Sequence, residues 1–123
     1  MKKVTLVTIV VFLIAGLGIA VNVFDPASSA EKPKVTFIDL GSELCIPCQK
    51  MVPVMDSIKV KYPDDVKVIF YNVSTKEGRP FAKKYKIKLI PTQIFLDREG
   101  KEYFRHEGYL PLAEVEKVLK QKL

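Results

Sequence analysis

The 123-residue sequence has few of the residues that build metal centres and covalent cross-links. It holds two cysteines, Cys45 and Cys48, a single histidine, His106, and no tryptophan. A structural zinc site normally takes four Cys or His ligands, so this set is too small and too scattered for one. There is also no internal repeat and no low-complexity tract. We therefore predict one domain of ordinary size with no metal and no other cofactor.

Charge is absent from the stretch Val4–Phe24, which consists mostly of Val, Ile, Leu and Ala. A helix of about 20 residues rises about 30 Å, enough to cross the hydrocarbon core of a bilayer. Lys2 and Lys3 precede the stretch, and positive charge at this position tends to stay in the cytoplasm. We expect a membrane anchor or signal segment over 1–24, a linker over 25–33, and a domain over 34–123.

Two interpretations of the first segment remain open. A cleaved signal peptide normally has an apolar region of about 7–15 residues, and this one is longer, which favours an uncleaved single-pass anchor. Small residues at Ser28, Ser29 and Ala30 nevertheless offer a cleavage site. Both interpretations place the domain outside the cytoplasmic membrane, in a periplasm or at the cell exterior.

Basic residues outnumber acidic ones, with a formal net charge of +6. Nucleic-acid binding would call for a basic stripe interleaved with aromatic residues, or a known motif, and neither is present. The local cluster at Lys83, Lys84, Lys86 and Lys88 is better explained as a solvated face that can lie near anionic lipids. No nucleic-acid partner is predicted.

Hydrophobic periodicity predicts an α/β fold in the order β-α-β-α-β-β-α. The first two strands should be parallel with a right-handed crossover, and the last two should form an antiparallel hairpin around Asp97–Gly100. Pro53 should kink the first helix. The result is one four-stranded mixed sheet with helices packed on it. The expected strands are 34–40, 66–73 (a buried strand), 92–96 and 101–106, and the expected helices are 46–62, 76–85 and one around 112–119.

Cys45 and Cys48 carry the strongest chemical signal. Thiol–disulfide exchange needs one accessible thiolate to attack and a second thiol near enough to resolve the mixed disulfide. A pair spaced C-x-x-C at a helix start supplies both, because unpaired backbone N–H groups there favour the thiolate of Cys45. Pro47 suits the first helical turn. A purely structural disulfide across two residues would close too small a loop to stabilise the fold much.

Asp39 is predicted to be a buried carboxyl. Alternation along the first strand places Val35, Phe37 and Asp39 on one apolar face. Burial should raise the pKa of Asp39 so that it can exchange protons near neutral pH. The alternative is an aspartate at the strand end that reaches solvent.

Together, these features resemble the thioredoxin family over nearly all of residues 34–123. The matching segments are Phe37–Leu40, Cys45-Ile46-Pro47-Cys48, Pro53, Ile90-Pro91-Thr92 and Gly108. The resemblance implies a thioredoxin-like fold and a cis peptide at Ile90–Pro91 that faces the cysteines. It also implies that the backbone of Ile90 pairs with a substrate peptide, and that Asp39 exchanges a proton with Cys48. Judged without the family resemblance, Pro91 would be an ordinary trans proline at the start of a strand.

Two departures from the family pattern concern the surroundings of the cysteines. Leu44 stands where many members have Trp, and Phe70 stands where a buried Lys is frequent, so Asp39 lacks that cation.

Membrane-anchored relatives imply an extracytoplasmic thiol–disulfide oxidoreductase that reduces protein disulfides, for example in cytochrome c maturation, with electrons from an integral membrane thiol carrier. Alternatives are a disulfide-forming oxidase of the same fold and a Cu(I)-binding module, although no further Met, Cys or His lies near the pair.

The uncharged segment predicts how the chain fractionates. If residues 4–24 form an uncleaved anchor, the full-length protein stays in the membrane fraction through carbonate washing. Protease added outside the cytoplasmic membrane then digests the domain. A soluble product that begins at Glu31 would instead identify the segment as a cleaved signal peptide.

Overall fold

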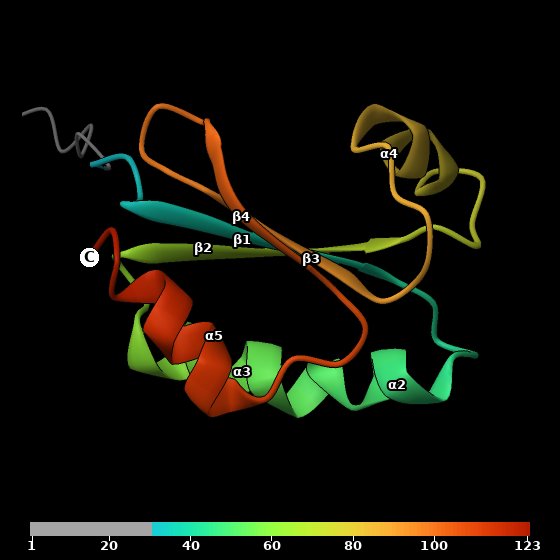
Figure 1. The fold of residues 1–123 in the computed structure, drawn as a ribbon, viewed down its shortest axis with the longest axis horizontal. Coiled ribbons are helices and arrows are strands. Elements are labelled where there is room, and N and C mark those ends of the chain that lie inside the picture. Colours follow the sequence, from blue (N-terminus) through green and yellow to red (C-terminus); the bar gives the residue numbers. More distant parts are fainter. Residues whose placement is uncertain (1–30) are drawn as a thin grey trace, which may run out of the picture. The chain divides into compact units, whose positions relative to one another are not determined.

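A four-stranded mixed sheet forms the centre of the fold (Figure 1). The computed structural model describes residues 31–123; the expected anchor over 1–24 and most of the linker lie outside these residues. The strand order is β2-β1-β3-β4, with β1 parallel to β2 and antiparallel to β3, and with β3 antiparallel to β4. The predicted sheet is therefore confirmed. Its strands are β1 Val35–Gly41, β2 Val66–Asn72, β3 Thr92–Leu96 and β4 Glu102–Glu107.

Within residues 31–123, four helices cover the two faces of this sheet. Helices α2, α3 and α5 lie on one face and α4 lies on the other (Figure 1). Within residues 31–123, no helix combines the length and the apolar composition that crossing a bilayer requires. The helices are α2 Ile46–Gln49, α3 Met51–Lys61, α4 Arg79–Lys84 and α5 Leu112–Leu119.

Strand β1 supplies core residues to both faces because its side chains alternate. Val35 and Phe37 point into the cluster beneath α3 and α5, whereas Ile38 and Leu40 join the cluster that α4 covers. The ring of Phe37 stacks on that of Phe95 on β3, with centroids 4.8 Å apart. Each fully buried side chain of this size contributes about 1.5–3 kcal/mol. The same alternation directs Asp39 toward the α2–α3 face.

The first helix is divided, as the proline predicts, but the break lies earlier than Pro53. Helix α2 ends at Gln49 and α3 begins at Met51, so Pro53 stands in the first turn of α3. A proline has no N–H to donate to the carbonyl four residues before it, and its ring crowds that carbonyl. Here that carbonyl belongs to Gln49, which is why the interruption falls at Lys50.

Strand β2 is less buried than its apolar sequence predicts. It lies at the edge of the sheet, and only Val66 among its residues is fully buried. Phe70 is 39% exposed, because an edge strand has a neighbouring strand on one side only. The expectation of a buried strand is therefore wrong for β2.

Two loops at the edges of the sheet depend on glycine. The β3–β4 hairpin turns at Asp97–Gly100 as predicted, with Gly100 at φ +82°, where side chains are strained. The connection from β2 to α4 passes so close to itself that a Cβ atom on Gly78 would collide with the carbonyl of Asn72. This second glycine is required for space.

Candidate active site

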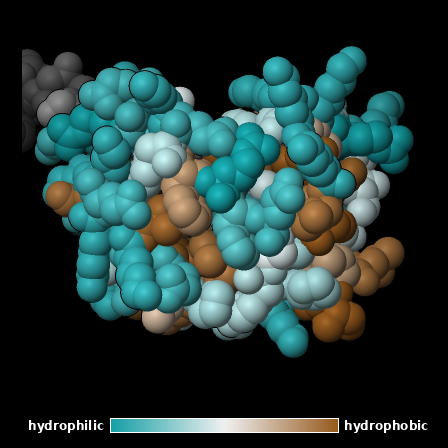
Figure 2. All heavy atoms as spheres, in the orientation of Figure 1, coloured by the Kyte–Doolittle hydropathy of each residue, from teal (hydrophilic) through white to brown (hydrophobic). Residues whose placement is uncertain are grey.

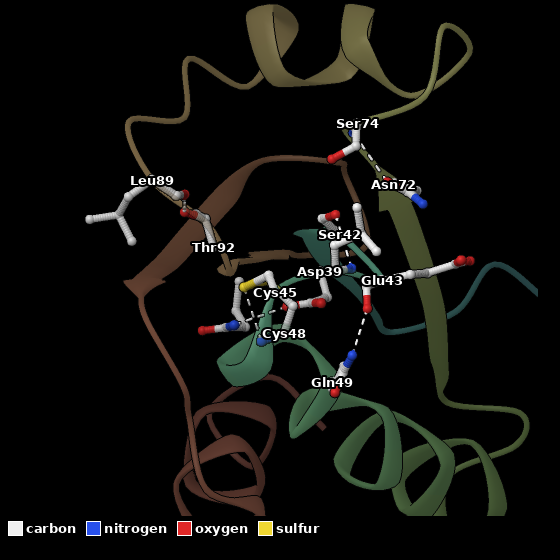
Figure 3. The surroundings of a disulfide bond; sticks show 12 residues. Asp39, Ser42, Glu43, Cys45, Cys48, Gln49, Asn72, Ser74, Leu89 and Thr92 are labelled. Carbon is white, nitrogen blue, oxygen red and sulfur yellow. Dashed lines mark hydrogen bonds between the residues drawn. A yellow bond between two sulfur atoms is a disulfide. The ribbon is translucent and has the colours of Figure 1, made fainter.

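Cys45 occupies the N-cap position of α2. Its backbone is extended, with φ −98° and ψ 119°, and its Sγ accepts a hydrogen bond from the N–H of Cys48 at 3.3 Å. The two residues form a disulfide, with Cα atoms 5.1 Å apart (Figure 3). Pro47 stands in the first turn, where its missing N–H costs no helical hydrogen bond. The sequence therefore starts the helix at the cysteine pair, as predicted.

The two cysteines differ in accessibility. Cys48 is only 2% exposed, whereas Cys45 is partly exposed. A large partner such as a protein disulfide can therefore approach the sulfur of Cys45 but not that of Cys48. In the reduced state, this difference suits Cys45 for attack on a substrate and Cys48 for the second, internal step.

Asp39 lies beneath this pair and is fully buried. It shares a face of β1 with Gly41, whose missing Cβ would lie 3.2 Å from Sγ of Cys48. Burial raises the pKa of Asp39 to about 6, and a hydrogen bond from Gln93 partly offsets that rise. The burial and the direction of the pKa predicted from the sequence are thus confirmed; its role in proton exchange stays a prediction.

The neighbours of Asp39 across the sheet are an aromatic ring and an amide. Phe70 is its register partner on β2, and Gln93 is its partner on β3. Phe70 therefore stands where the resemblance implies a lysine is frequent, as expected. Gln93 was not anticipated, although a polar residue inside the apolar run Thr92–Leu96 is a signal that could have singled it out.

The loop before β3 lies at the same end of the sheet as the cysteines, since Thr92 pairs with Leu40 near the end of β1. The peptide bond between Ile90 and Pro91 is cis, as the resemblance implies. Thr92 Oγ1 donates a hydrogen bond to the carbonyl of Leu89 at 2.7 Å and holds the loop (Figure 3). Among residues 31–123, the backbone N–H and C=O of Ile90 have no hydrogen-bond partner, which leaves them available to an extended peptide.

Apolar side chains surround the pair at the surface. In Figure 2, hydrophobic residues gather at the end of the molecule where α2 lies. A pocket of about 320 Å³ opens beside Cys48, with Val52, Met55 and Phe70 in its wall. The exposed apolar residues at this end are Leu44 at 90%, Ile46 at 64%, Val52 at 49%, Phe70 at 39% and Leu89 at 46%.

The remaining candidates have ordinary structural surroundings. His106 Nε2 lies 3.2 Å from the carbonyl oxygen of Tyr109, and Met51 and Met55 belong to the core. In the part of the chain that the structure describes, no three His, Cys, Asp or Glu side chains gather as they would around a metal ion.

The sheet topology and the cysteine pair at a helix start define a thioredoxin-fold protein with a redox-capable disulfide. A family model described as a thioredoxin-like domain matches residues 23–123. The chain therefore belongs to the thioredoxin-like domain family.

Individual relatives agree with this assignment. The chain is 34% identical to chloroplastic thioredoxin Y of Oryza sativa subsp. japonica over 67% of its own length and 46% of that protein. It is 31% identical to thioredoxin 1 of Synechococcus elongatus, over 70% of this chain and 78% of the other. The chain thus spans about half the length of the first of these curated relatives.

Solved structures confirm the fold. The crystal structure of an exposed lipoprotein thioredoxin from Streptococcus pneumoniae superposes with a TM-score of 0.66 at 21% identity. The match covers 73% of this chain and 86% of that one.

The burial of Asp39 predicts an unusual dependence of stability on pH. Between the ordinary carboxyl pKa of 3.8 and the raised value of about 6, the folded protein holds a proton that the unfolded chain has lost. Stability supplied by Asp39 is therefore present at low pH and is lost as pH rises through this window. Asp39→Asn removes the titration and should be more stable than the wild type at pH 7 by up to about 3 kcal/mol.

Urea unfolding of the oxidised protein at several pH values between 4 and 7 measures this difference. The gap between Asp39→Asn and the wild type should be small at pH 4 and largest at pH 7. Asp56→Asn, which changes an exposed carboxyl on α3, is the matched control and should show no such trend. Parallel curves for Asp39→Asn and the wild type would mean that Asp39 titrates normally.

Proposed function

We propose that this chain is a protein-disulfide reductase that acts through the Cys45–Cys48 dithiol on the outer side of the cytoplasmic membrane. One observation carries the proposal: a partly exposed cysteine caps α2 and is disulfide-bonded to a cysteine that is 2% exposed. Exposure of one sulfur and burial of the other is what a two-step exchange requires.

The reaction begins with the reduced dithiol. The thiolate of Cys45 attacks one sulfur of a substrate disulfide, forms a mixed disulfide, and releases the other substrate sulfur as a thiolate. Cys48 then loses its proton and attacks Sγ of Cys45, which forms the Cys45–Cys48 disulfide and releases the second substrate thiolate. Two electrons pass from the protein to the substrate, and a dithiol donor must return them.

The second step needs a base because a buried thiol does not ionise readily. Asp39 supports this role, since it lies under α2 and its pKa of about 6 leaves it mostly ionised at neutral pH. Its carboxylate accepts the proton of Cys48 as the internal attack begins. A general base works best with a pKa near the working pH.

The substrate is proposed to lie as an extended segment along the loop that ends at Pro91. The free backbone groups of Ile90 can pair with such a segment as a strand edge does. Exposed apolar residues such as Leu44 and Leu89 add contacts beside the reactive sulfur.

The location and the partners rest on the sequence. The uncharged run Val4–Phe24 supports a membrane tether with the domain outside the cytoplasm. Because that compartment is generally oxidising, the disulfide must be reduced again by an integral membrane thiol carrier. Protein disulfides, including those at haem-attachment sites of cytochrome c precursors, are the proposed substrates.

The order of the two steps predicts which variant traps partners. Cys48→Ser leaves Cys45 able to attack but unable to be released, so mixed disulfides with partner proteins accumulate. Cys45→Ser should trap none, because the remaining cysteine, Cys48, is only 2% exposed. Non-reducing gels of cells that express each variant measure this difference. Trapping by Cys45→Ser alone would reverse the assignment.

The direction of electron flow predicts the reduction potential. A strongly stabilised thiolate favours the dithiol and makes a strong oxidant, but Ile46 and Pro47 between the cysteines supply no cation to stabilise it. We therefore expect a reducing potential, below roughly −200 mV. Equilibration of the purified protein with glutathione buffers measures it. A value near about −120 mV would contradict the reductase and favour a disulfide-forming oxidase.

A further inference from the structure

Gln93 is the only side chain that hydrogen-bonds to Asp39 within residues 31–123. It is fully buried on β3, directly opposite Asp39 in the register, and its Nε2 donates to Oδ1 of Asp39 at 2.9 Å. A buried amide away from water costs free energy unless it is hydrogen-bonded. A leucine or methionine at this position would fill the space without that cost, so packing alone does not explain an amide here.

The bond leaves two buried atoms without partners. Oδ2 of Asp39 and Oε1 of Gln93 have no hydrogen-bond partner among the described residues, and both are acceptors while Asp39 is ionised. A proton on the carboxyl would convert one of these acceptors into a donor. An amide carries both a donor and an acceptor, so it can donate to the carboxylate and accept from the protonated carboxyl, whereas an ammonium group can only donate.

We propose that Gln93 is a positioning residue that holds the Asp39 carboxyl for proton exchange with Cys48 and sets the pH range of that exchange. The proposal rests on the function proposed above, in which Asp39 is the base for Cys48. Gln93 acts through Asp39 and touches neither the substrate nor the reacting sulfur.

Few other titratable groups face this carboxyl. Helix α2 contributes Cys48, β2 contributes Phe70, and the buried residues of α3 and α5 are all apolar. On β4, an ionisable side chain on the same face is His106, the register partner of Gln93. The charged residues at the neighbouring pocket, Glu43, Asp56 and Lys59, are exposed to solvent.

The hydrogen bond from Gln93 and the burial of the carboxyl have opposite effects on the pKa of Asp39. Burial raises the pKa of Asp39 to about 6, and the donated N–H lowers it by stabilising the carboxylate. Without that donor the pKa rises further, and less carboxylate is available to accept the proton of Cys48. As the pH is lowered, the rate of the second step should then begin to fall at a higher pH than in the wild type.

The test is Gln93→Met, which keeps the length of the side chain and removes the amide, in the full-length chain in detergent. The rate of mixed-disulfide resolution is measured against pH, and the acid limb is the part of this curve where the rate falls as pH decreases. This limb should shift by about one unit toward higher pH, which is about a tenfold loss of rate at a given pH on the limb. The rate well above the limb should be unchanged. In an Asp39→Asn background, Gln93→Met should shift nothing further.

Two controls separate this role from structural support. Ile94→Val removes one methylene from the opposite face of β3 and lowers stability without touching Asp39, so its acid limb should stay in place. His106→Asn should also leave the limb in place. If Gln93→Met behaves like Ile94→Val, or if His106→Asn abolishes the limb, the proposal is wrong.

A measurement on the wild type covers the case in which Gln93→Met does not fold. By NMR of the reduced chain, the side-chain amide of Gln93 should titrate with the same midpoint as the carboxyl carbon of Asp39, and Asp39→Asn should abolish that titration. An amide signal that stays constant across the range would overturn the proposal. These titrations do not depend on turnover, so an inactive wild type would contradict the proposed function without altering them.

Discussion

The packing of α2 on the end of β1 is the constraint on which the geometry of the site depends. A Cβ atom on Gly41 would lie 3.2 Å from both Cβ and Sγ of Cys48 and 3.3 Å from the ring of Phe70, closer than most real contacts of this kind. A side chain there would require Cys48 or Phe70 to shift by a few tenths of an ångström. The glycine therefore lets α2 pack against the strand with one sulfur buried, while the other, at the helix cap, remains accessible. The difference in exposure between the two cysteines accompanies this close approach.

The same packing seals Asp39 from water. The carboxyl lies on the face of β1 that α2 and α3 cover, between Phe37, which is buried in the core, and Gly41 at the strand end. Its surroundings are apolar except for the cysteine pair and the amide of Gln93, so desolvation outweighs hydrogen bonding and the pKa rises. Stability and reactivity are thus opposed at one residue. An apolar side chain at this position would stabilise the core, whereas the carboxyl is the base proposed for Cys48.

Much of this arrangement could be predicted from the sequence because its signals are local. The alternation in β1, the turn at Asp97–Gly100 and the cysteine pair before a helix each depend on a few consecutive residues. Two features that the sequence did not predict depend on residues far apart. An apolar run does not reveal that β2 lies at an edge, and the bond between Asp39 and Gln93 joins residues 54 apart in sequence through a register that no local pattern sets. The break before α3 fell at Lys50 because a proline acts on the carbonyl four residues before it.

The ring and the amide on either side of Asp39 in the sheet explain why the pKa of its carboxyl is raised to about 6. A lysine at the position of Phe70 would be in register with Asp39 and would hold it ionised by charge attraction, which lowers a carboxyl pKa. The phenyl ring contributes instead to the burial that raises the pKa of Asp39. The one neutral hydrogen bond from Gln93 lowers that pKa, but by less than burial raises it. The balance places the pKa at about 6, where the group can both accept and release a proton. Features that cost stability concentrate at functional sites. A carboxyl kept in the core at this cost therefore supports the proton exchange with Cys48 proposed above.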